Sequence, residues 1–217
     1  MAVEYENGRL YNGYFVGVYI LPRDEMEMDR LDLLHDVYLR LDLLYRAPLT
    51  QKCHPSRILD LGTGTGIWAL DMADKFRNTI VVGTDISPIQ PEWVSPNCQF
   101  VVDNMEADWT FGPEEQFDFI HCRDLSGSLR NYPRLMQQAM QNMTTNGYLE
   151  IQEQEIWIYS DHGVENVEWI MIWQTLLHAA SVKFGKSLRT AEYLKNWMAA
   201  AGYIDIRHEI QKVRGFR

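Results

Sequence analysis

Short apolar runs alternate with longer amphipathic segments along most of this chain. The short runs predict buried strands at 57–61, 79–85, 98–104, 117–123 and 148–153. Apolar residues at helical spacing predict helices at 67–76, 133–143, 164–184 and 190–201. Strands that alternate with helices form a doubly wound, mostly parallel sheet. We therefore expect an α/β fold of the Rossmann-like kind, with one more strand at 203–213.

The segment before this alternation has a different pattern. Residues 1–22 are rich in aromatics and glycine, which predicts irregular structure packed over the mouth of a site. Apolar residues from Leu31 to Leu44 recur every three or four positions and predict a helix that begins near Asp24. We expect one domain, with an N-terminal cap at 1–50 and a core at 57–217.

A glycine-rich turn joins the first core strand to the first core helix. The turn reads D-x-G-x-G-x-G. It does not match the dinucleotide-binding pattern G-x-G-x-x-G, because the third glycine of that pattern would fall at position 67, where the chain has Ile67. The turn resembles motif I of the class I S-adenosylmethionine (SAM) methyltransferases, where it wraps the amino-acid end of SAM. Its candidate cofactor residues are Asp60, Gly62, Thr63, Gly64 and Gly66.

A second element supports this interpretation. The β-branched run 79–85 ends in Asp85, 19 residues after Gly66. A carboxylate at the end of the second strand can accept both hydroxyls of an unphosphorylated ribose, which SAM and NAD share.

The ends of the remaining strands supply further candidates, because ligands of such sheets lie beyond the carboxyl ends of the strands. We expect either Asp103 or Asn104 to bind the adenine amino group and the Met105 backbone to meet a ring nitrogen. Arg123 is expected to bind the carboxylate of SAM, with a salt bridge to Asp124 or Glu153 as the alternative. Ile86 follows Asp85 and completes the set.

Methyl transfer from a sulfonium needs mainly alignment, although a hydroxyl or amine acceptor can also need a general base. His121 and Glu153 are the catalytic candidates because they lie at strand ends. The N-terminal cap offers Tyr11, Tyr19 and His35 as candidates for the substrate pocket. For His35, a packing role is the preferred alternative.

Composition narrows the class of protein. The net charge of −10 disfavours direct nucleic-acid binding, which needs a basic face. Cys53, Cys98 and Cys122 lack CxxC spacing, so we expect reduced thiols in an intracellular protein and no metal site. The longest apolar stretch, 169–180, is too short to span a bilayer. We expect a soluble cytoplasmic or nuclear protein without membrane contact.

Several longer motifs resemble the fungal LaeA-like methyltransferases. They are Asn7-Gly8-Arg9 with Tyr11, Tyr19-Ile20-Leu21-Pro22 with Asp24-Glu25 and Asp29-Arg30-Leu31, the run 59–68, the run 83–91, the run 117–121 and the run 147–153. The resemblance implies a class I fold, SAM as cofactor and a fungal origin. Members include regulators of secondary metabolism that associate with velvet-type proteins, and enzymes that methylate secondary metabolites.

The chain departs from that family at three places. Asn104 replaces a frequent second acid, which favours Asp103 as the adenine partner, and Thr145-Asn146-Gly147 replaces a Pro-Gly-Gly-like turn. The sequence ends at Arg217, so the final antiparallel strand of the family's sheet is missing. An uncovered edge at 203–213 would invite a second copy or a protein partner. The alternative is a shortened chain.

Three functions follow as hypotheses. The first is a SAM-dependent methyltransferase acting on a small-molecule fungal secondary metabolite, at oxygen or nitrogen. The second is a LaeA-like regulator that works through velvet-type partners. The third is a methyltransferase fold reused for a reaction other than methyl transfer.

Overall fold

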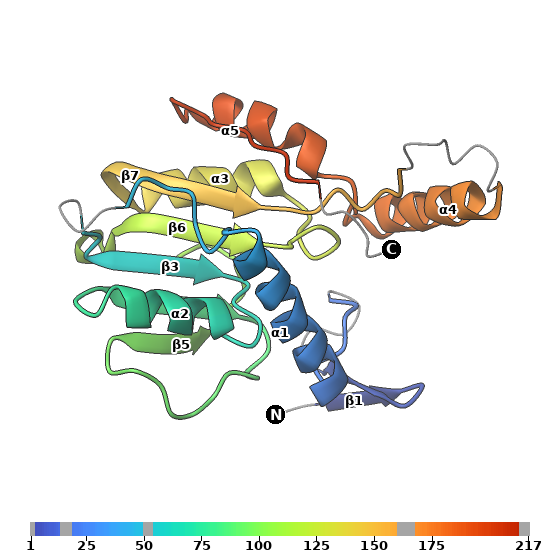
Figure 1. Cartoon of the computed structure of the whole chain (residues 1–217), viewed down its shortest axis with the longest axis horizontal. Coiled ribbons are helices and arrows are strands. Elements are labelled where there is room, and N and C mark those ends of the chain that lie inside the picture. Colours follow the sequence, from blue (N-terminus) through green and yellow to red (C-terminus); the bar gives the residue numbers. More distant parts are fainter. Residues whose placement is uncertain (1–2, 14–18, 50–53, 160–167, 213–217) are drawn as a thin grey trace.

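The core of the molecule is a parallel sheet of five strands, ordered β5-β4-β3-β6-β7 (Figure 1). The computed structural model describes residues 3–13, 19–49, 54–159 and 168–212. The strands are β3 (Arg57–Leu61), β4 (Ile80–Asp85), β5 (Cys98–Val102), β6 (Phe117–Arg123) and β7 (Met143–Gln152). β3 is the first strand of this sheet along the chain. The chain then adds β4 and β5 on one side of β3, and β6 and β7 on the other. The carboxyl ends of β3, β4 and β6 therefore lie at the switch in strand order, where such sheets bind ligands.

Helices cover both faces of this sheet, which confirms the doubly wound architecture. Trp68 and Met72 of α2 (Ile67–Lys75) belong to the core cluster on one face. Leu135 and Met136 of α3 (Tyr132–Gln141) belong to the cluster on the other face, where α5 (Leu194–Ala201) packs on α3. β3 itself is buried on both sides, so the turn that follows it starts from a fixed point.

The N-terminal segment is more regular than its composition predicts. β1 (Val3–Glu6) and β2 (Arg9–Asn12) form an antiparallel hairpin. Its two-residue turn is Asn7-Gly8, and both residues have positive φ, 48° and 78°. Asn-Gly favours that conformation in hairpin turns, because asparagine and glycine both tolerate positive φ. The expectation of irregular structure over 1–22 was therefore wrong for 3–12.

The cap helix α1 (Glu25–Arg40) begins where the sequence predicts. The Asp24 carboxylate accepts the backbone N–H of Glu27 at 3.1 Å and a pair of hydrogen bonds from Arg9. The helix ends at Arg40, earlier than the apolar stripe, because Asp42 turns the chain with φ of 56°. Figure 1 shows α1 crossing the carboxyl ends of the strands.

Residues 203–212, the described part of the last predicted strand, form no strand. The expectation of a strand there was wrong. A strand is stabilised by a neighbour, and β7 forms the edge of the sheet on that side. Asp205 also has φ of 52°, which interrupts an extended chain, and Ile204 and Ile210 are 85% and 78% exposed. The prediction that a second copy or a protein partner covers a strand edge at 203–213 therefore has no strand to rest on in the described part, 203–212.

Two other boundaries differ from expectation. Asn146 and Gly147 lie inside β7 rather than in a turn before it, beside a register shift between Phe117 and Phe119. The predicted helix at 190–201 is a 3₁₀ turn, η2 (Ala191–Tyr193), followed by α5. A second 3₁₀ turn, η1 (Pro113–Glu115), precedes β6. The remaining helix, α4 (Glu168–Phe184), lies within the predicted 164–184.

None of the helices in the described ranges combines the length and the apolar character that crossing a bilayer requires.

Candidate functional site

The turn after β3 depends on its glycines. Gly62, Gly64 and Gly66 have φ of 67°, 58° and 84°, a region that other residues rarely adopt. A Cβ on Gly66 would lie 2.4 Å from the Phe100 ring, and one on Gly62 would lie 2.9 Å from Leu125. Gly66 thus serves packing, whereas Gly62 and Gly64 line a cavity.

That cavity lies at the carboxyl ends of the strands and measures about 110 Å³. α1 contributes Arg30, Leu31 and Leu34 to its wall, and Leu31 approaches Gly64 closely. The predicted residues that line it are Tyr19, Asp60, Gly62, Thr63, Gly64, Asp85, Ile86, Asn104, Met105, His121 and Arg123. The fold thus brings most of the predicted cofactor set to one place.

Asp60 organises the floor of the cavity. It is 3% exposed, and its Oδ2 accepts the Thr63 hydroxyl at 2.6 Å. Its Oδ1 lies 2.8 Å from Nδ1 of His121, its register partner on β6. A carboxylate can only accept, so Nδ1 carries the hydrogen and Nε2 of a neutral His121 has a free lone pair.

His121 is held firmly but is only half satisfied. Its ring stacks on the Trp68 indole, with centroids 3.7 Å apart and planes 5° apart. Nε2 is buried and has no hydrogen-bond partner among the described residues. A buried polar atom without a partner is costly, which marks Nε2 as a contact point for a ligand.

Arg123 is likewise held in place by its neighbours, while one of its nitrogens has no hydrogen-bond partner among the described residues. Its guanidinium lies over the Tyr38 ring at 4.5 Å, and Nη2 donates to Nδ1 of His35 at 3.0 Å. Nη1 is buried without a partner in the described part of the chain. The alternative salt bridge to Asp124 is 4.0 Å long, at the limit of such contacts.

His35 does not line the cavity. It is 2% exposed and bridges Arg123 to Asp71, whose Oδ2 lies 3.0 Å from its Nε2. An arginine can only donate, so Nδ1 of His35 accepts and Nε2 donates to Asp71. His35 therefore orients Arg123, and its expected place in the substrate pocket is not observed.

Asp85 lies at the end of β4 with both carboxylate oxygens engaged. Oδ2 accepts the Gly64 N–H at 2.9 Å and Oδ1 accepts the Ser87 N–H at 2.8 Å. Burial raises the pKa of this carboxyl to about 6, against the lowering effect of those two bonds. Each oxygen retains a second lone pair for a further donor.

The end of β5 separates the two adenine candidates. Asn104 and Met105 line the cavity, whereas Asp103 is exposed and accepts the N–H of Asn104. The Met105 carbonyl accepts the indole N–H of Trp109 at 3.0 Å, and Trp109 packs against the core rather than the cavity. Asn104 is therefore the better placed of the two.

The cap and β7 place the other candidates differently. Tyr19 lies in the cavity wall and hydrogen-bonds to Ser128, and burial raises the pKa of its phenol. Tyr11, on β2, is not among the lining residues. Glu153 is not among them either, and it accepts the Ser126 N–H and the Tyr132 hydroxyl, both at 3.0 Å. Burial, with the nearby Asp124 charge, raises the pKa of Glu153 to about 7.

Several lining residues were outside the predicted site set, and two of them, Lys186 and Arg30, carry a positive charge. Lys186 is 2% exposed and donates to the Ser128 carbonyl at 2.5 Å. Arg30 forms a two-point ion pair with Glu27 beside the cavity mouth. The sequence predicts Arg30 on or beside the apolar stripe of the cap helix, where a packing or surface role was preferred to a ligand contact. A lone lysine after α4 carries no pattern, so nothing in the sequence indicates Lys186.

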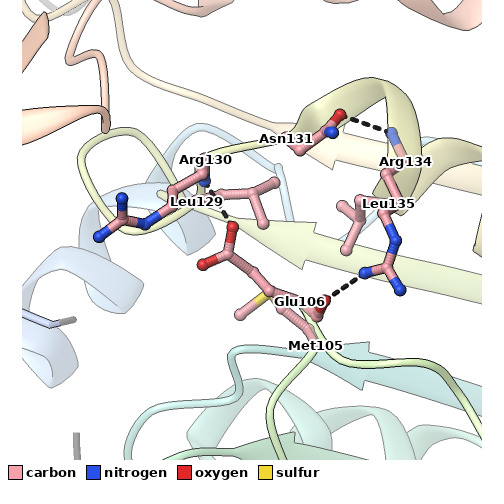
Figure 2. Close-up of a pocket in the computed structure, with 7 residues that line it drawn as sticks. All are labelled: Met105, Glu106, Leu129, Arg130, Asn131, Arg134 and Leu135. Carbon is pink, nitrogen blue, oxygen red and sulfur yellow. Dashed lines mark hydrogen bonds between the residues drawn. The ribbon is translucent and has the colours of Figure 1, made fainter.

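A second cavity of about 300 Å³ lies beyond Met105 and Glu106 (Figure 2). The polar groups that line it are engaged with one another. Glu106 accepts the Arg130 N–H at 2.7 Å, and the Arg134 guanidinium donates to the Glu106 carbonyl. The glycine turn, Asp85 and the two unpartnered atoms all belong to the first cavity, which is therefore the candidate site.

Comparison with known proteins agrees with this geometry. Residues 33–208 match a family described as a methyltransferase domain. The chain is 41% identical over 206 residues to "Methyltransferase pytC" of Aspergillus terreus, covering 92% of this chain and 62% of that protein. It is 36% identical over 214 residues to "Secondary metabolism regulator LAE1" of Cochliobolus heterostrophus, covering 96% and 69%. The chain thus spans less than two thirds of the length of pytC.

Solved structures support the fold. A phosphoethanolamine N-methyltransferase 2 of Haemonchus contortus, in complex with SAM, superposes with a TM-score of 0.52 at 20% identity, over 77% of this chain and 37% of that one. A putative methyltransferase complexed with the Haloferax volcanii Trm112 activator gives 0.57 at 16%, over 83% and 74%. Together with the matched residues and the glycine turn after β3, these likenesses lead to one conclusion: the chain belongs to the methyltransferase-domain family, among fungal secondary-metabolism relatives of the LaeA kind.

Proposed function

We propose that this protein is a SAM-dependent methyltransferase that modifies a small-molecule fungal secondary metabolite at oxygen or nitrogen. The observation that carries the proposal is the pair of unpartnered buried atoms, Nε2 of His121 and Nη1 of Arg123. These residues are two apart on β6, so their side chains share one face of the sheet. One atom accepts a hydrogen bond and the other is a charged donor.

A zwitterionic α-amino acid group complements this pair. Its ammonium donates to Nε2 of His121, and its carboxylate accepts from Nη1 of Arg123. The methionine end of SAM carries that group. The Gly62–Gly64 turn leaves room beside it, Asp85 meets the ribose hydroxyls and Asn104 meets the adenine amino group. His121 then positions the cofactor, which replaces its candidate role as a general base.

Methyl transfer in this arrangement depends on alignment and on exclusion of water. Leu31 and Tyr19 close the cavity from the cap side and exclude solvent from the sulfonium. Glu153 lies outside the cavity wall, so we propose no proton transfer through it. An acceptor that is a free amine or a phenol of lowered pKa needs no strong base.

A regulatory role through protein partners is the second candidate. The relatives named as secondary metabolism regulators favour it, since LAE1 is 36% identical over nearly the whole chain. Velvet-type partners, and a cytoplasmic or nuclear location, stay predictions. As a methyltransferase, the regulator would use the same SAM site and differ in the methyl acceptor; as a scaffold, it would transfer no methyl group.

The distribution of a labelled methyl group tests the proposal. The protein is incubated with methyl-labelled SAM and a fungal extract split into organic-soluble and protein fractions. We expect label in the organic fraction, abolished by Asp85→Ala. Label in the protein fraction alone would support a regulatory methyltransferase, and label in neither fraction would refute both methyltransferase roles.

A further inference from the structure

Polar and apolar side chains of α4 together face the body of the protein. Gln174, His178 and Ser181 share this inward side with four half-buried apolar residues, Ile170, Met171, Leu177 and Phe184. Gln174 is 3% exposed and accepts the Ile158 N–H, and the Ser181 hydroxyl accepts the Leu188 N–H at 3.2 Å. The His178 ring meets the Trp157 indole edge-on. The most exposed face of a surface helix is ordinarily polar.

The outward face carries an apolar stripe. Trp169, Ile172, Trp173 and Leu176 are 78%, 40%, 56% and 64% exposed, and they follow the i, i+3, i+4, i+7 spacing of one helical face. Ala180 continues the stripe by one turn. Figure 1 shows α4 extending away from the sheet. Two exposed tryptophans in one stripe mark an interaction surface.

We propose that this stripe is a self-association surface, on which α4 of a second copy packs antiparallel about a twofold axis at Leu176. The sequence of the helix is self-complementary in that arrangement. Trp173 faces Ala179 of the second copy and Ile172 faces its Ala180, so a large side chain meets a small one at each level.

The charges at the helix ends fit the same direction. Glu168 opens α4 and Lys183 lies in its last turn. An antiparallel pair brings Glu168 beside Lys183 of the second copy at both ends, with the Lys183 ammonium over Trp169. A parallel pair would set like charges against each other. Within one chain the two residues lie about 22 Å apart along the helix, too far to interact.

The size of the contact sets its strength. Each tryptophan can bury about 150–250 Å², so four of them with the isoleucines and leucines approach the roughly 1,000 Å² of a specific interface. We expect dimers with a dissociation constant on the order of 10 μM. This surface is distinct from the sheet edge and from the cavity, and the proposal does not depend on SAM binding.

Sedimentation of the whole chain across this concentration range tests the proposal. Leu176→Glu should weaken dimerisation at least tenfold, because it sets two charges on the twofold axis. Val182→Glu is the matched control: Val182 is 54% exposed on the same helix but lies outside the stripe, so dimers should persist. Thermal unfolding of each variant verifies that it is folded.

A charge exchange tests the direction of pairing. Glu168→Lys or Lys183→Glu alone should weaken the dimer, and the double exchange should restore it. A wild-type chain that stays monomeric up to about 1 mM would overturn the proposal. Dimers that survive Leu176→Glu, or that the double exchange fails to restore, would overturn it as well.

Discussion

Nδ1 of His121 lies 2.8 Å from Oδ1 of Asp60, and the two residues are register partners on adjacent strands. The pair fixes which nitrogen of the imidazole carries the hydrogen. It thereby presents an acceptor to the cavity, where Nη1 of Arg123 is also buried without a partner among the described residues. In the proposed SAM complex, one carboxylate beneath the methionine subsite would thus set its polarity.

Reversing that polarity should weaken cofactor binding. In Asp60→Asn the amide can donate to Nδ1, which moves the ring hydrogen to Nε2 and turns it toward the ammonium. We expect the affinity for S-adenosylhomocysteine to fall about 10- to 150-fold, a loss of about 1.5–3 kcal/mol. Calorimetry measures it. An analogue without the amino group should lose much less, and equal losses for both ligands would contradict the assignment.

His35 should act through Arg123 alone. His35→Phe removes the acceptor that holds Nη2, so we expect S-adenosylhomocysteine to bind roughly 3- to 10-fold more weakly, a loss of about 1 kcal/mol. 5′-Methylthioadenosine lacks the carboxylate and should bind unchanged. His35→Gln keeps an acceptor and is the conservative control. A loss shared by both ligands would mean that His35 supports the fold rather than Arg123.

Asp85 should carry the ribose contact. Asp85→Ala removes two charge-assisted hydrogen bonds, each worth about 1.5–3 kcal/mol, so binding should weaken at least tenfold. Both 5′-methylthioadenosine and S-adenosylhomocysteine should lose equally, because they share the ribose. Unchanged affinity in a folded variant would leave Asp85 as a brace for the Gly64 and Ser87 amides only.

Glu153 should make stability depend on pH. Its pKa is raised to about 7, so the folded chain binds a proton more tightly than the unfolded chain. The stabilising contribution is complete below the unfolded pKa near 4.5 and is lost as pH rises through about 7. We expect unfolding free energy to fall by roughly 1–3 kcal/mol over that window and the slope to flatten in Glu153→Gln. A slope that the variant leaves unchanged would assign the effect to other groups.

The sequence predicts the sheet well because buried parallel strands are apolar throughout, as in 57–61 and 117–123. It fails at 203–212, where apolar alternation is present but the described chain does not pair with the edge strand β7. The Asn7-Gly8 hairpin turn was visible in the sequence and was overlooked. Local pattern decides whether a segment can extend, and tertiary pairing decides whether it does.

The residues of the candidate site also fall into two groups, those that local spacing predicts and those that tertiary contacts define. Asp60, Asp85 and the glycines are predictable because their spacing from a strand fixes their position. The roles of His35 and Lys186 depend on contacts with Arg123 and Ser128, far away in the chain, and no spacing encodes those contacts. Asn104 and Asp103 are adjacent, and only the direction of the chain after β5 separates them.

Titration of the folded wild-type chain with S-adenosylhomocysteine, in parallel with the analogue that lacks the amino group, tests the central claim most directly. We expect a dissociation constant in the micromolar range, on the order of −8 kcal/mol, and binding at least tenfold weaker for the analogue. Absence of binding heat with S-adenosylhomocysteine would contradict the account of the cavity as a SAM site. Equal affinity for the two ligands would contradict the role of the His121–Asp60 pair.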